Sequence, residues 1–129
     1  MSQDFKIVHG CIRVLDLEKS IEFYENALDF EVTRRSDYPE DEFTLVFLKG
    51  SGSDFEIELT YNYDREEPYE IGDGFSHFAV VVDDIKDAHK EHKKAGYEVT
   101  DIYTVGDEAG GGLYFITDPD GYEVEIIQK

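Results

Sequence analysis

Two stretches of this chain carry the same pattern of residues, one beginning at His9 and the other at His77. HGCIRVLDLEKSIEFYENALDFEVT and HFAVVVDDIKDAHKEHKKAGYEVT align at a separation of 68 positions. After a one-residue deletion near residue 97, FEIEL at 55–59 matches YEVEI at 122–126 at a separation of 67. An internal repeat constrains the fold more than any single motif, because both copies are expected to form the same supersecondary unit.

The first copy predicts a strand, a helix and three more strands. Residues 6–14 alternate between apolar and polar, which is typical of a strand with one buried face. Asp16 is a plausible N-cap for a helix over 17–28, where apolar residues recur at helical spacing. Alternation resumes after the helix and predicts strands at 30–35, 43–48 and 55–61.

The second copy predicts the same order, so the fold class is α+β with two tandem βαβββ modules. Asp83 or Asp84 caps its helix, and Gly96 ends it. Strands are expected at 97–103, 112–117 and 121–127, the last two joined by the tight turn DPDG. At 129 residues the chain is interpreted as a single domain, 1–129, with modules 6–61 and 75–127 joined by a loop over 62–74.

Composition excludes several partners. The chain has 31 acidic against 12 basic residues, a net charge of −19, which disfavours binding to nucleic acid or to anionic membranes. One cysteine, Cys11, excludes an intramolecular disulfide framework and suits a reducing compartment. With no signal-like N-terminal segment and no apolar run of membrane-spanning length, we expect a cytoplasmic protein.

The polar faces of the predicted strands carry one histidine and one glutamate at corresponding places in both copies. The four residues are His9, Glu58, His77 and Glu125. Two imidazoles and two carboxylates form a donor set suited to a divalent ion such as Zn²⁺, Ni²⁺, Co²⁺ or Fe²⁺. Alternation does not distinguish these glutamates from Glu56 and Glu123, which share the same faces.

Three other residues have side chains of the right chemistry but are interpreted as structural. His89 and His92 lie three residues apart on the Lys-rich second helix, where we expect an exposed face. Cys11 lies one alternate position beyond His9 and could line a cleft, but it is expected to be a small packed side chain.

Five motifs resemble the vicinal oxygen chelate superfamily and, within it, the short bacterial type of the glyoxalase I (lactoylglutathione lyase) family. They are HGCIRV, DLEKSIEFYENALDF, IELTYN, GFSHFAVVVDD and DPDGYEVEII, and the resemblance covers about residues 6 to 127. It implies curved mixed sheets with the helices packed on the outer face. It also implies that His9, Glu58, His77 and Glu125 are the metal ligands, which favours Glu58 over Glu56.

The activity implied by this resemblance is isomerisation of the hemithioacetal of methylglyoxal and a thiol into an S-lactoylthiol ester. Glu125 would be the main catalytic base, with Glu58 as its symmetry-related partner. Arg13 and Asn62 would hold the glutathione part of the substrate. The resemblance further implies one divalent ion per site, with Ni²⁺ or Co²⁺ favoured and Zn²⁺ as the alternative. The sites would lie at a homodimer interface, with His9 and Glu58 from one chain and His77 and Glu125 from the other.

One departure from the usual pattern of the family leaves the identity of the thiol open. Where the family usually has a basic residue before the penultimate strand, this chain has Asp107, Glu108 and several glycines. The thiol is therefore glutathione or another low-molecular-weight thiol. Other functions on this fold are a thioester epimerase, an extradiol dioxygenase or other metalloenzyme, and a metal-free binding or resistance protein. The last two usually lack the full set of two histidines and two glutamates.

Overall fold

The computed structural model describes residues 3–104 and 111–129. The chain divides into two compact units, Met1–Tyr69 (unit 1) and Glu70–Lys129 (unit 2). The division falls inside the segment 62–74, which the sequence predicts as the link between its two copies.

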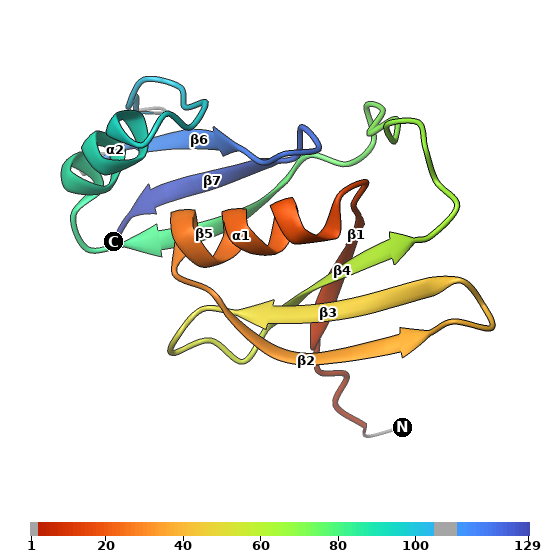
Figure 1. Ribbon diagram of the computed structural model, residues 1–129. Helices are drawn as coiled ribbons and strands as arrows, with labels where there is room; N and C mark the ends of the chain where they lie inside the picture. The colour runs from red at the N-terminus through yellow and green to blue at the C-terminus, as the bar shows by residue number, and fades with distance from the viewer. Residues whose placement is uncertain (1–2, 105–110) are drawn as a thin grey trace. The chain divides into compact units, whose positions relative to one another are not determined.

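Unit 1 contains one helix and a four-stranded sheet (Figure 1). Its elements in chain order are β1 (His9–Arg13), α1 (Leu17–Leu28), β2 (Glu31–Tyr38), β3 (Phe43–Lys49) and β4 (Glu56–Asn62). The strand order is β1-β4-β3-β2; β1 runs parallel to β4, and the other neighbours are antiparallel. The predicted βαβββ order is confirmed for this unit.

Helix α1 begins and ends where its sequence predicts. The Asp16 carboxylate accepts a hydrogen bond from the Lys19 amide at 3.2 Å, satisfying one of the free N–H groups of the first turn. Asp29 then takes a left-handed conformation, with φ of 54°, and ends the helix. The buried residues of α1 form one face, and the helix contacts β2 and β4.

The sheet of unit 1 has one apolar and one largely polar face, because side chains alternate along each strand. Ile12, Val46, Leu48, Ile57 and Leu59 are all nearly inaccessible to solvent and build the core. The histidine and glutamate side chains of β1 and β4 occupy the opposite face.

Unit 2 contains β5 (His77–Val82), α2 (Ile85–Lys94), β6 (Leu113–Thr117) and β7 (Glu123–Gln128), with strand order β5-β7-β6. Strand β5 runs parallel to β7, as β1 does to β4. The prediction of a strand over 97–103 is wrong: this segment forms only isolated bridges to β6. The hydroxyl of Thr100 accepts the hydrogen bond of the Phe115 amide at 2.9 Å, so a side chain replaces a backbone carbonyl and interrupts the ladder.

Helix α2 has Asp84, not Asp83, as its N-cap. Its two histidines do not form the exposed face that the sequence predicts. His92 is buried, and its Nδ1 lies 2.8 Å from the hydroxyl of Tyr114; the ring of His89 also packs edge-on against Tyr114. Burial raises the pKa of Tyr114 to about 12, so this hydroxyl keeps its proton. Both histidines lie at helical spacing from Ile85, with His92 buried in the core of unit 2 and His89 half-buried at its edge.

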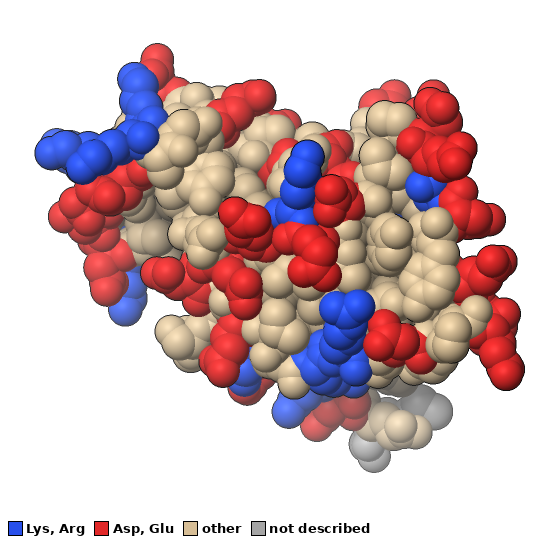
Figure 2. All heavy atoms as spheres, viewed as in Figure 1, with Lys and Arg blue, Asp and Glu red and all other residues tan. Residues whose placement is uncertain are grey.

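Acidic side chains are spread over the face in Figure 2, while basic ones gather in a few separate groups, one of them on α2. The lysines of α2 are Lys86, Lys90, Lys93 and Lys94, all exposed. This face has no continuous basic stripe of the kind that nucleic-acid phosphates require. Among the described residues, no helix is long and apolar enough to span a membrane.

The matched caps give a test of the fold. We expect Asp16→Ala and Asp84→Ala each to lower the free energy of unfolding by about 1 kcal/mol, because each removes an acceptor for a helix amide. Urea denaturation measures the loss. Asn at either position keeps the acceptor and should retain most of the stability, and an Asn variant as unstable as the Ala variant would contradict the capping role.

Candidate metal centre

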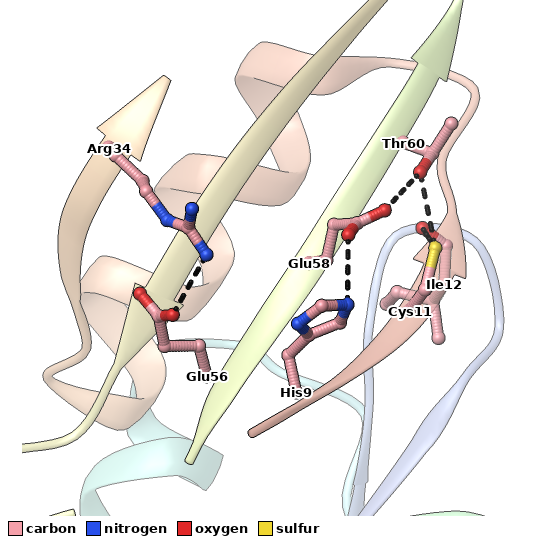
Figure 3. Close-up of polar contacts among 7 residues, drawn as sticks. All are labelled: His9, Cys11, Ile12, Arg34, Glu56, Glu58 and Thr60. Atoms are coloured by element: carbon pink, nitrogen blue, oxygen red, sulfur yellow. Dashed lines mark hydrogen bonds and ion pairs between the residues drawn. The ribbon is translucent and has the colours of Figure 1, made fainter. Parts of the chain in front are cut away.

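In unit 1, the imidazole of His9 on β1 faces the carboxylate of Glu58 on β4 (Figure 3). His9 Nε2 lies 3.3 Å from Glu58 Oε1, and the two side chains are 37% and 15% exposed. The parallel register places Glu56, not Glu58, directly opposite His9. The contact therefore spans one pleat along the strand, on one face of the sheet.

Glu56 lies on the same face but is engaged elsewhere. It accepts a hydrogen bond from the Thr33 hydroxyl and pairs with Arg34 at 3.2 Å. The hydrogen bond from Thr33, with a smaller contribution from the Arg34 charge, holds the pKa of Glu56 below its ordinary value. Figure 3 shows Glu56 turned toward Arg34 while Glu58 turns toward His9 and Thr60. The structure thus separates two glutamates that alternation alone leaves equivalent.

Unit 2 contains the same contact. His77 Nε2 lies 2.9 Å from Glu125 Oε1, with the side chains 30% and 17% exposed. The register pairs His77 with Glu123 and Ala79 with Glu125, so this contact also spans one pleat. The other ring nitrogen, Nδ1, lies 2.6 Å from the hydroxyl of Ser76. A hydrogen bond at this second nitrogen fixes the ring and is typical of metal-binding histidines.

A phenylalanine ring supports each imidazole, and neither ring is predicted from the sequence. The ring of His9 meets Phe47 edge-on at a centroid distance of 5.4 Å, and His77 meets Phe115 in the same way at 5.0 Å. Each phenylalanine is also paired in register with the glutamate of its unit. Phe47 and Phe115 are 68 positions apart, but the glutamates that they pair with are 67 apart, so the aligned repeat sets Tyr114 opposite Phe47 and does not identify the pair.

Each pair is suited to hold a metal ion but provides only part of a site. Two ligand atoms at about 2.1 Å from an ion, at right angles to each other, are about 3 Å apart, close to both observed nitrogen–oxygen distances. Within residues 3–104 and 111–129, no group of three or more potential ligands is close enough to bind an ion. A four-ligand centre therefore needs both pairs.

Cys11 is not the packed side chain that was expected. It is accessible to solvent, and its Sγ lies 3.1 Å from the Thr60 hydroxyl, which donates to Glu58 Oε2 at 3.1 Å. Partial burial raises the pKa of the Cys11 thiol, so the sulfur keeps its proton at neutral pH. Cys11 and Thr60 thus lie beside the candidate ligand Glu58.

The two predicted substrate-binding residues both belong to unit 1. Arg13 is exposed at the end of β1, on the face of His9, and its neighbour in register on β4 is Thr60. Asn62 lies one pleat beyond Thr60 and donates a hydrogen bond from its side-chain amide to the Tyr69 hydroxyl at 2.9 Å. Asp107 and Glu108 lie outside the described residues.

Residues 6–126 match the model of the Glyoxalase/Bleomycin resistance protein/Dioxygenase superfamily. A lactoylglutathione lyase of Neisseria meningitidis is 41% identical over 129 residues, which span 96% of this chain and 91% of the relative. The chain belongs to the glyoxalase I family. A probable lactoylglutathione lyase of Synechocystis and the lactoylglutathione lyase of Haemophilus influenzae are each 39% identical to this chain over nearly its whole length.

Solved structures of glyoxalase I agree with this assignment. The trypanothione-dependent enzyme of Leishmania major superposes with a TM-score of 0.83 at 37% identity, over 97% of this chain and 87% of the other. Glyoxalase I of Zea mays superposes with a TM-score of 0.86 at 35% identity; the match spans 96% of this chain but 44% of the maize chain. An antibiotic-binding protein of Streptomyces, TnmS3, shares the fold at 16% identity.

The two glutamates of β4 give a test of the candidate centre. We expect Glu58→Gln to weaken Ni²⁺ binding at least about tenfold, because it removes a charged oxygen facing His9. Glu56→Gln is the matched control on the same strand and face, and it should bind Ni²⁺ as the unmodified protein does. Isothermal titration calorimetry measures both affinities. The opposite order of effects would assign the metal to Glu56.

Proposed function

We propose that this protein is a metal-dependent lactoylglutathione lyase that removes methylglyoxal. It converts the hemithioacetal of methylglyoxal and a thiol into an S-lactoylthiol ester. The observation that carries the proposal is the histidine–glutamate contact found in the same form in both units, with Nε2 facing Oε1 at 3.3 Å and 2.9 Å. The ligands are His9, Glu58, His77 and Glu125.

The reaction is an internal transfer of hydrogen. The carbon-bound proton moves from C1 to C2, and the hydroxyl proton moves from the oxygen on C1 to the oxygen on C2, so the product is an isomer of the substrate. When bound, the divalent ion supplies positive charge that stabilises the negative charge developing on these two oxygens. The carbon acid still requires a base positioned close to C1.

Glu125 is the main base in this proposal. Its carboxylate takes the proton from C1 and returns it to C2. Glu58 occupies the matched position in the other unit, so the two carboxylates can address hydrogens on opposite faces of a chiral hemithioacetal. The imidazoles of His9 and His77 are each supported by a phenylalanine ring, which keeps their nitrogen donors in a fixed arrangement.

The complete donor set is assembled in a homodimer. His9 and Glu58 come from one chain, and His77 and Glu125 come from its partner. A two-fold symmetric dimer then contains two equivalent sites, as an isologous interface requires. The proposal keeps the cytoplasmic location expected from the sequence, and Ni²⁺ or Co²⁺ as the activating ion, with Zn²⁺ as the alternative.

The thiol is held by Arg13 and Asn62. Arg13 places a positive charge on the face of His9 in a protein of charge −19, and its guanidinium can bind a carboxylate group of the thiol cosubstrate. The thiol is glutathione or another low-molecular-weight thiol, since Asp107 and Glu108 stand where the family usually has a basic residue. Within the family the thiol does vary: the Leishmania major relative is described as trypanothione-dependent.

The direct test is an assay of thioester formation from methylglyoxal with glutathione and with other thiols, after loading with Ni²⁺, Co²⁺ or Zn²⁺. We expect activity with at least one thiol, lost on exhaustive chelation and restored by about one ion per site. Full activity after chelation would overturn the role of the metal. Epimerisation of a thioester without isomerisation of the hemithioacetal would favour the epimerase instead.

Glu125→Gln tests the base. We expect it to lower kcat about 100-fold or more, because an amide cannot accept the proton from C1. Glu123→Gln is the control on the same strand and the same face, one pleat away, and should leave kcat unchanged. Thermal unfolding verifies that both variants fold. Near-normal turnover by Glu125→Gln would remove this residue from the mechanism.

Mixed dimers test the shared sites. His9→Ala and His77→Ala chains should each be inactive alone. Co-expression gives about half mixed dimers, each with one intact site, so about one quarter of normal activity should return. If all four ligands came from one chain, no mixed dimer would contain an intact site, and the absence of activity would contradict the proposal.

A further inference from the structure

The two matched glutamates have different hydrogen-bonding partners, although each faces a histidine. Glu58 Oε1 faces His9, and its Oε2 accepts a hydrogen bond from the Thr60 hydroxyl at 3.1 Å. Both oxygens of Glu58 are thus engaged. Figure 3 shows the chain of contacts that runs from His9 through Glu58 and Thr60 to Cys11.

The hydroxyl of Thr60 fixes one contact of this chain, because its single proton is donated to Glu58 Oε2. Cys11 Sγ lies 3.1 Å from Thr60 Oγ1, and the thiol also donates to the Ile12 carbonyl at 3.9 Å. The Cys11 sulfur therefore lies against the hydroxyl that Thr60 turns toward the carboxylate.

In the described part of unit 2, no counterpart of this chain of contacts is present. The residue opposite Glu125 in register is Ala79, as Cys11 is opposite Glu58. The residue two positions after Glu125 is Ile127, where unit 1 has Thr60. Neither side chain can donate a hydrogen bond. Among the residues that the structure describes, the one polar side-chain partner of the Glu125 carboxylate is His77, which contacts Oε1.

We propose that Thr60, supported by Cys11, is a positioning residue that holds the carboxylate of Glu58 as a ligand. This inference rests on the proposed function. It gives the two matched carboxylates different surroundings: within the described residues, Glu58 has a hydroxyl donor beside its histidine, and Glu125 has its histidine alone.

A threonine on a strand is common for steric reasons alone, because β-branched side chains fit a pleated surface. A purely structural role would depend on the shape of Thr60, whereas positioning depends on its hydroxyl. Val has nearly the same shape without the hydroxyl, and Ser keeps the hydroxyl without the methyl group. These two substitutions therefore separate the two roles.

We expect Thr60→Val to weaken Ni²⁺ binding about tenfold, the size typical of losing a group that orients a ligand, while kcat at saturating Ni²⁺ changes little. Thr60→Ser should bind Ni²⁺ within about twofold of the unmodified protein. Cys11→Ala should lie between them, because it removes only the support. Isothermal titration calorimetry gives the affinities, and thermal unfolding verifies that each variant folds.

The outcomes separate this inference from the proposed function. If the unmodified protein binds Ni²⁺ and forms the thioester but Thr60→Val binds Ni²⁺ equally well, the positioning role is wrong and the proposed function stands. If the unmodified protein neither binds Ni²⁺ nor turns over, the proposed function fails, and this inference fails with it.

Discussion

Parallel pairing between the first and last strands of each unit is the constraint on which the candidate centre depends. In both pairs of strands, β1 with β4 and β5 with β7, the register sets a histidine one pleat from a glutamate on the same face. A shift of one residue would turn one partner into the apolar core. The buried side chains on the other face, such as Leu59 and Ile126, therefore fix the register and with it the contact.

Much of the fold could be predicted from the sequence because the repeat and the caps are local signals. Asp16 and the spacing after it locate helix 17–28 to the residue. The errors arise where side chains compete with the backbone or where polar residues fill a core. Thr100 takes an amide that a strand would have used, and His92 is buried against Tyr114 on a helix whose composition indicates exposure.

The candidate site was predictable in part for the same reason. The repeat selects positions, so it finds the histidines, but it misses Phe47 and Phe115, which are one residue out of the alignment that matches their glutamates. It does not reveal which neighbouring acid faces the histidine, because Glu56 and Glu58 share a face and differ only in their partners. The repeat also does not show how the two copies differ beside the glutamate. Thr60 corresponds to the apolar Ile127, and this difference matters only because Thr60 donates a hydrogen bond to Glu58 while Glu56 is bound elsewhere.

The central claim is that the two histidine–glutamate pairs act together on one ion. The most direct measurement is the number of Ni²⁺ ions bound per chain by the unmodified protein and by His9→Ala and His77→Ala variants. The account predicts about one ion per chain, and almost none in either variant, because each removes a ligand from a shared centre. Two ions per chain, with each variant losing one and keeping the other, would contradict it.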